Sequence, residues 1–300
     1  MAVKGNFNRI INLTLNKSSY DDKGFKALTP TFIRCPVRGR KPKIEINGTW
    51  TTDVDMPAFN ITIQNLYIDI LKDQYSSVEV ECGYEGNTKT IQGDIITMYQ
   101  ESPGPEGKTV IQCVYGRLQQ WLDATVSLNF EAGTPIGAVL DSIKDKIKAE
   151  RLMFGVKAAA LSLKAPMSFT GTARGALNYL INEFQDEKLS IYPHGLEIRA
   201  LCVSKGDVIG VPRVLQYISA PPQENTGGDE GTYYTTINAP WMPELSIGDK
   251  LTIPSKVYIR NFSTVGSAAK TQNIQVTTLS FHFGTVGNVN SMTVQGFLVR

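Results

Sequence analysis

Histidine and cysteine are scarce in this 300-residue chain. It contains two histidines, His194 and His282, which leaves little material for a histidine-based catalytic triad. We interpret His194 as an exposed turn residue. No CxxC pair occurs among the four cysteines, so their spacing predicts no zinc site; they are Cys35, Cys82, Cys113 and Cys202. Two of them lie in predicted strands, where a thiol acts as a small apolar core residue.

Long apolar runs are also missing. No segment approaches the roughly 20 residues of a membrane helix, so no membrane insertion is expected. The first ten residues, MAVKGNFNRI, lack the apolar core of a secretory signal, so we expect no export by that route. The sequence has no GxSxG or HExxH motif, and GPEGKT at 104–109 lacks the first glycine of a phosphate-binding loop. We therefore predict no catalytic residue, no metal and no cofactor, although a glycosidase carboxylate pair need not be adjacent in sequence.

Carboxylates are absent from 250–300 and rare in 1–43, so the two ends of the chain are basic and its middle is acidic. Five basic residues cluster near the N-terminus, and these are our interface candidates: Arg34, Arg38, Arg40, Lys41 and Lys43. A nucleic-acid protein more often shows a basic stripe with interleaved aromatics. The alternatives are a phosphate site, a solvated loop or an arm that docks on an acidic partner.

Hydrophobic content of 42% and charged content of 19% fit a globular protein of two or three domains. Alternation of apolar and polar residues predicts a three-stranded antiparallel meander over 77–116. Further strands are expected at 6–20, 44–46 and 58–63, and short helices at 65–72 and 118–123. Residues 27–45 are rich in Pro and Arg and predict a long loop.

Apolar spacing of three and four residues predicts helices over 136–150 and 172–183. Thr134 and Pro135 supply the start signals of the first helix. A hairpin is expected from 188–191 and 196–200, and Gly206-Asp207 and Gly248-Asp249 predict tight turns that lead into strands. Residues 221–231 contain no hydrophobic residue and predict a surface tip or hinge.

The hairpin outline of 91–115 returns at 274–299. Ile91-Gln92 matches Ile274-Gln275, Gly104 matches Gly287, and Thr109-Val110 matches Thr293-Val294. Two copies indicate two related β domains rather than a solenoid, although amphipathic hairpins also look alike by chance. The predicted fold class is α+β, mostly β, with two tube-like antiparallel β domains at 1–116 and 203–300 and a helix-containing α+β insert at 117–202.

The ordered series of motifs resembles the baseplate hub proteins of contractile-tailed phages, which are related to the hub half of secretion-system spike proteins. VEVECGYEG, TIQGDIITMYQ and TVIQCVYG carry the likeness in the first half, and PELSIGDKLTIPS carries it near the end. The resemblance implies a homotrimer whose six tube-like domains form a pseudo-hexameric ring between the tail tube and the central spike.

The resemblance further implies a non-enzymatic virion protein, present in host cytoplasm during assembly. Its partners would be the tail tube protein, the central spike protein and the tape measure protein, with DNA only as cargo in the channel. No spike or lytic half follows Arg300, so we expect a separate spike chain. Two alternatives remain: a hexameric distal tail or tube-terminator protein, against which the duplication argues, and a glycan-binding or glycan-cleaving β protein.

Overall fold

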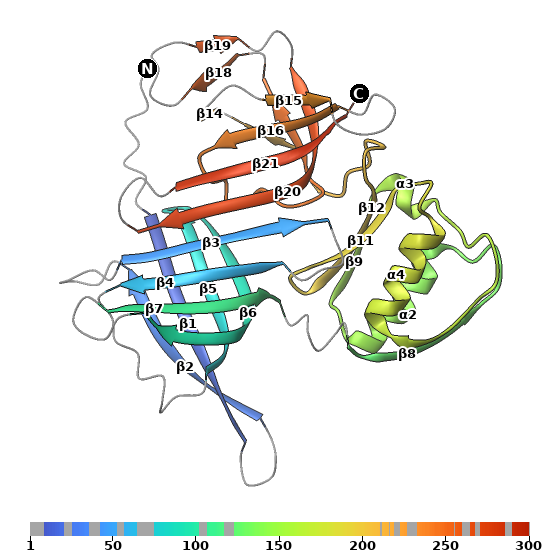
Figure 1. Ribbon diagram of the computed structural model, residues 1–300, viewed down its shortest axis with the longest axis horizontal. Coiled ribbons are helices and arrows are strands. Elements are labelled where there is room, and N and C mark those ends of the chain that lie inside the picture. The colour runs from blue at the N-terminus through green and yellow to red at the C-terminus, as the bar shows by residue number, and fades with distance from the viewer. Residues whose placement is uncertain are drawn as a thin grey trace.

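The computed structural model describes residues 9–20, 26–35, 43–52, 57–64, 75–101, 107–116, 123–210, 212–215, 217–218, 223–226, 233–254, 256–259, 265–267, 271–285 and 290–299. The fold is α+β and mostly β, as the sequence predicts. Figure 1 shows a large β body with a helix-containing lobe packed on one side of it. No helix in the described part of the chain is long and apolar enough to span a bilayer.

One sheet of 13 strands forms the β body, in the order β15-β16-β21-β20-β3-β4-β7-β6-β5-β1-β2. β17 also pairs with β20, and β13 pairs with β17. The first 116 residues contribute β1 (Arg9–Tyr20), β2 (Lys26–Cys35), β3 (Lys43–Thr51), β4 (Ala58–Gln64), β5 (Tyr75–Tyr84), β6 (Asn87–Gln100) and β7 (Lys108–Tyr115). The expected meander is therefore confirmed as β5, β6 and β7.

The C-terminal part of the chain completes the sheet. It contributes β13 (Arg213–Val214), β15 (Gln223–Thr226), β16 (Tyr233–Ala239), β17 (Lys250–Ile253), β20 (Gln272–Gly284) and β21 (Asn290–Leu298). A small separate sheet combines β14 (Tyr217–Ile218), β18 (Lys256–Ile259) and β19 (Val265–Ser267).

The lobe beside the β body lies between the two sets of sheet strands in sequence (Figure 1). Its elements are β8 (Thr125–Phe130), α2 (Ile136–Ile147), β9 (Arg151–Phe154), α3 (Val156–Ala159), β10 (Met167–Thr172), α4 (Ala173–Glu183), β11 (Leu189–His194) and β12 (Glu197–Cys202). A hydrophobic core of its own, from Val126 to Cys202, holds this insert together.

The two predicted helices of the insert form for the expected reason. α2 buries one apolar face that includes Val139, Leu140 and Ile143, and α4 buries Leu177 and Leu180. Their caps differ, however. Thr172 accepts a hydrogen bond from the Gly175 amide at the start of α4. Thr134 instead donates its hydroxyl to the Glu131 carbonyl, and α2 begins without a side-chain cap.

A five-stranded unit occurs twice in the main sheet. In the first half the spatial order is β3-β4-β7-β6-β5, and in the second half it is β15-β16-β21-β20-β17. The strands follow each other in the same chain order, and every neighbouring pair in both units is antiparallel. This agreement in topology supports an internal duplication, whereas the domain boundaries drawn from the sequence stay a prediction.

A shared irregularity aligns the two units. The register of the β6–β7 pair shifts between Ile95 and Thr97, and that of the β20–β21 pair shifts between Val276 and Thr278. Equating these bulges places Ile95 on Val276. This structural alignment differs by two residues from the sequence alignment, which matched Ile91 with Ile274. A displacement by an even number of residues keeps each side chain on the same face of the sheet.

The same alignment places buried residues on buried residues in the other strands. Val78 and Val80 of β5 fall on Leu251 and Ile253 of β17, and all four are buried. A sheet that repeats both pairing and burial is stronger evidence for duplication than the hairpin outline alone.

The expected loop over 27–45 is wrong for most of its length. Residues 26–35 form β2, which pairs with β1 along ten Cα partners, and β3 begins at Lys43. β2 is the terminal strand of the sheet, where Pro30 costs no ladder hydrogen bond if its nitrogen faces outward. Part of the predicted tip at 221–231 is likewise strand β15. The expected helices at 65–72 and 118–123 lie mostly outside the described residues.

One hydrophobic cluster runs through both halves of the β body, from Ile11 to Val294. The sheet is strongly curled within it. The guanidinium of Arg9 at the start of β1 donates to the Gly284 carbonyl at 3.0 Å, and the rings of Tyr84 and Phe283 lie 5.7 Å apart. Strands that are distant in the sheet order are therefore close in space.

Candidate functional site: the junction of the two halves

The two five-stranded units are joined along one strand pair, which we call the seam. It consists of residues 45–51 of β3 paired with residues 278–284 of β20. The hydroxyls of Thr49 and Ser280 lie 3.0 Å apart on its outer face. At its end, the Thr285 amide donates to the Ile44 carbonyl at 2.9 Å and the Ile44 amide donates to the Thr285 hydroxyl at 3.0 Å.

Aromatic side chains fill the inner face of the seam. The rings of Trp50 and Phe281 lie 4.8 Å apart, and those of Trp241 and Phe283 lie 4.5 Å apart. All four are buried. Gly48 leaves room for the Phe281 ring and for the neighbouring strand β4, because an added Cβ would lie 3.1 Å from that ring and 2.8 Å from the Phe59 Cβ. Burial of four large rings makes the seam a strong apolar contact between the two halves.

The outer face of the seam forms an open cavity of about 460 Å³. Polar side chains from four adjacent strands predominate in its lining, which comprises Asn47, Gly48, Thr49, Ala58, Asn60, Ser280, Phe281, His282, Ser291, Met292 and Thr293. His282 lies 3.7 Å from the Glu45 carboxylate. Burial raises the pKa of Glu45, but Lys43 and His282 lower it by more, so the net shift is downward.

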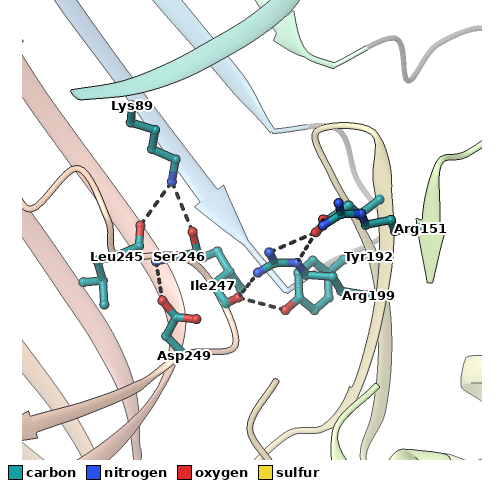
Figure 2. Close-up of polar contacts among 9 residues, drawn as sticks. Lys89, Arg151, Tyr192, Arg199, Leu245, Ser246, Ile247 and Asp249 are labelled. Carbon is teal, nitrogen blue, oxygen red and sulfur yellow. Dashed lines mark hydrogen bonds and ion pairs between the residues drawn. The ribbon is translucent and has the colours of Figure 1, made fainter. Parts of the chain in front are cut away.

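A second contact between the halves involves the loop Leu245–Asp249, which we call the bridging loop. Lys89 of β6 reaches it from the first half (Figure 2). Its amine donates to the Leu245 carbonyl at 3.2 Å and to the Ser246 hydroxyl at 3.1 Å, and it lies 4.6 Å from the centre of the Trp50 ring. Burial lowers the pKa of Lys89 to about 8.

The insert contacts the same loop from its other side (Figure 2). The Ile247 carbonyl accepts hydrogen bonds from the Arg199 guanidinium at 3.0 Å and from the Tyr192 hydroxyl at 3.2 Å. Glu197 pairs with Arg199 at 3.0 Å. Asp249 accepts the Ser246 amide at 2.9 Å, and burial raises its pKa. The bridging loop, part of the PELSIGDKLTIPS motif, therefore ties three parts of the chain together.

Asp207 anchors the exit of the insert. Its buried carboxylate accepts the amides of Lys157, Ala158 and Cys202, each at 3.0 Å. Gly206-Asp207 was expected to lead into a strand, but no strand begins at Val208. The amides of Lys157 and Ala158 are distant from Asp207 in sequence, so only the tertiary structure reveals this role. Gly248-Asp249, in contrast, directly precedes β17 as expected.

His194 does not lie in an exposed turn. The hairpin is longer than predicted, so that His194 is the last residue of β11 and is buried. Its ring lies 5.5 Å from the ring of Tyr115 and 6.1 Å from that of Trp50. Burial, with Arg199 and Lys89 nearby, holds its pKa well below the usual value. The side chain is therefore a neutral core residue at neutral pH.

The five basic interface candidates are not assembled into one described patch. Lys43 begins β3 and pairs with Glu45 at 2.6 Å. Arg34 lies on β2, opposite Asn12, and five strands separate β2 from β3 in the sheet order. Arg38, Arg40 and Lys41 lie outside the described residues. Among the described residues, no group of three or more His, Cys, Asp or Glu side chains could hold a metal ion.

Neither a protein-family model nor a curated protein sequence matches the chain. Solved structures do match its fold. The 43 kDa tail protein of prophage MuSo2 from Shewanella oneidensis aligns with a TM-score of 0.54 at 8% identity, covering 98% of this chain and 97% of that one. A tail protein from Neisseria meningitidis aligns with a TM-score of 0.55 at 6% identity, covering 97% of each chain.

A third structure comes from a bacterial secretion machine. It is a component of the Escherichia coli type VI secretion system, described as structurally similar to the T4 bacteriophage tail proteins gp27 and gp5. Its TM-score is 0.52 at 8% identity, covering 87% of this chain and 75% of that one. Together with the duplicated sheet and the insert between its halves, these alignments show that the chain has the fold of phage tail proteins and of this secretion-system component.

Proposed function

We propose that this chain is a structural hub protein of a phage tail or related injection machine. In this role three chains form a pseudo-hexameric ring that joins the six-fold tail tube to a central spike. The observation that carries the proposal is the repeated five-stranded unit. A trimer whose chains each hold two equivalent units presents six units to a six-fold tube. The shared fold with two tail proteins supports the same reading.

The proposal includes the partners that this role requires, namely the tail tube protein, the central spike protein and the tape measure protein. The description of the secretion-system component as similar to phage tail proteins supports a place in a tail-like injection machine. We propose a non-enzymatic role in the virion tail, with assembly in the host cytoplasm. The junction residues support it, because Lys89, Arg199 and Asp249 are used in internal contacts.

The mass of the assembled protein tests the proposal. Light scattering and native mass spectrometry of the purified full-length chain should give a species of about three times the 33.0 kDa chain mass. A six-fold mass would favour a distal tail or tube-terminator ring instead. A chain that stays monomeric up to high concentration would overturn the ring. Binding in a glycan array would favour the glycan-binding alternative.

A further inference from the structure

The seam inside the chain has an unpaired counterpart in each unit: the terminal strand β15 in the second unit, and part of one edge of the interior strand β6 in the first, as far as the described residues show. In the alignment of the two units, β15 of the second half corresponds to β3 of the first half. Likewise, β20 of the second half corresponds to β6 of the first half. β3 and β20 pair with each other, but β15 is a terminal strand of the sheet. The edge of β6 that corresponds to the seam edge of β20 pairs with β5 only as far as Asp94. Among the described residues, no strand pairs with that edge beyond Asp94.

The free part of β6 also exposes apolar side chains. Ile96 is 61% exposed and Tyr99 is 40% exposed, and few other large hydrophobic residues in the described chain are exposed. Ile96 is the bulged residue of β6 and corresponds to Thr277 of β20, whose carbonyl accepts the Thr52 amide where the chain leaves the seam. The free backbone groups of β6 are therefore equivalent to the groups of β20 that pair with β3 in the internal seam.

We propose that β15 of one chain pairs antiparallel with the free edge of β6 in a second copy of the chain, and so repeats the β3–β20 seam between chains. This inference rests on the proposed ring and specifies its contacts. The two edges belong to opposite units of the chain and lie far apart in Figure 1. A single chain therefore cannot satisfy both edges, and the contact is heterologous, joining the second unit of one chain to the first unit of the next.

The internal seam fixes the register of the proposed pair. Leu279 pairs with Trp50 and Ser280 pairs with Thr49 in the seam. In the bulge alignment, Met98 and Tyr99 are equivalent to Leu279 and Ser280, and Thr226 and Asn225 are equivalent to Trp50 and Thr49. The proposed contact between chains therefore pairs Met98 with Thr226 and Tyr99 with Asn225. Tyr99 then takes the place of Ser280 on the outer face. A one-residue slip would move every side chain to the wrong face, so the register is a strong constraint.

Disulfide cross-linking of the full-length chain tests this register. Directly opposed residues of an antiparallel pair have Cα atoms about 4.5–5.5 Å apart, which suits a disulfide. A Tyr99→Cys/Asn225→Cys variant should form a covalent ladder that ends at the trimer under mild oxidation and is reversed by a reductant. A Tyr99→Cys/Thr226→Cys variant, one residue out of register, should give at least about ten-fold less product. The wild-type chain, treated identically, accounts for the native thiols.

A charge substitution on the β6 edge provides an independent measurement. Ile96→Lys should weaken self-association by at least about ten-fold, because a partly apolar contact would have to bury an ammonium group. Its thermal midpoint as a monomer should stay unchanged, since the side chain is exposed. Val156→Lys is the matched control, because Val156 is also an exposed apolar residue, 82% exposed, and lies on α3 of the insert. This control should affect neither quantity.

The outcomes separate the two proposals. A trimer whose Tyr99→Cys/Asn225→Cys variant does not cross-link overturns the register but not the ring. Cross-linking in register with open filaments supports the strand pair and overturns ring closure. A monomer at high concentration without cross-links overturns both. Equal loss of association in Ile96→Lys and Val156→Lys would also contradict a specific role for the β6 edge.

Discussion

Lys89 is a half-buried cation held by two oxygen acceptors and an aromatic ring. Its amine contacts the Leu245 carbonyl, the Ser246 hydroxyl and the face of Trp50. Burial lowers its pKa from 10.5 to about 8. The folded protein therefore releases this proton more readily than the unfolded chain does, and the charged form is the less favourable one in the folded state.

The pH dependence of stability tests this environment. Between about pH 8 and 10.5 the unfolded state binds more protons at Lys89 than the folded state, so the wild-type chain should gain stability as pH rises, relative to Lys89→Met. The full gain is at most about 3 kcal/mol. Urea unfolding of both chains at several pH values across that range measures it. Parallel curves would contradict a lowered pKa.

Gly48 of β3 lies against Ala58 and Phe59 of the neighbouring strand β4 and against the Phe281 ring of β20. Gly48→Ala should destabilise the fold by about 1–3 kcal/mol, because its Cβ would lie 2.8 Å from the Phe59 Cβ and 3.0 Å from the Ala58 carbonyl. Gly137→Ala in α2 is the control, since its Cβ would meet only the Phe154 ring at 3.6 Å. That change should stabilise by up to about 1 kcal/mol. Equal effects in thermal unfolding would argue against close packing at the seam.

At the scale of elements, two threonines with similar sequence contexts behave differently. Thr172 caps α4 through the Gly175 amide, whereas Thr134 bonds to Glu131 before α2 begins. Thr172→Ala should therefore cost about 1 kcal/mol of stability. Thr134→Ala should cost less, because no helix amide loses an acceptor. Denaturant unfolding of the two variants decides between them, and a larger loss for Thr134→Ala would contradict the assignment of the caps.

The bridging loop is the element on which the three parts of the chain converge. Lys89 reaches it from the first half, and Arg199 and Tyr192 reach it from the insert. Its own backbone is held by Asp249, which accepts the Ser246 amide. Because these contacts are hydrogen bonds to a short loop, the two halves and the insert are coupled at one place in addition to the seam.

At the scale of the whole molecule, the sheet halves are joined internally, and among the described residues no strand pairs with the outer edge of β15 or with the edge of β6 beyond Asp94. This arrangement is what a head-to-tail ring requires, since each contact between chains would repeat the contact within a chain. We expect the basic cluster to contact the acidic middle of an adjacent chain, because opposite charges favour association.

We expect Arg38→Ala/Arg40→Ala/Lys41→Ala to weaken assembly without unfolding the monomer. A matched control removes three positive charges elsewhere, with Lys146→Ala/Arg151→Ala/Lys205→Ala on the exposed surface of the insert and the turn after it. Light scattering at physiological salt measures assembly, and circular dichroism measures folding. Unchanged assembly of the first variant would leave the cluster as ordinary solvated surface.

The sequence by itself determined the elements with a strong local period. Alternation over 77–116 gave the meander, and spacing of three and four residues gave α2 and α4, because periodicity reports which side of an element is buried. The duplicated hairpin was visible in the sequence as well. Its alignment was displaced by two residues, because a match of residue types cannot locate a bulge that only strand pairing defines.

Only the tertiary structure decided the rest. Residues 26–35 lack a clear period and contain a proline, yet they form β2 because β1 offers them a complete edge. The sequence predicts His194 in an exposed turn, yet the curled sheet and the insert enclose it. The Asp207 carboxylate accepts hydrogen bonds from the amides of Lys157 and Ala158, which are about fifty residues away in the chain. In each case the decisive partner is distant in sequence, and local pattern carries no information about which distant group will cover a residue.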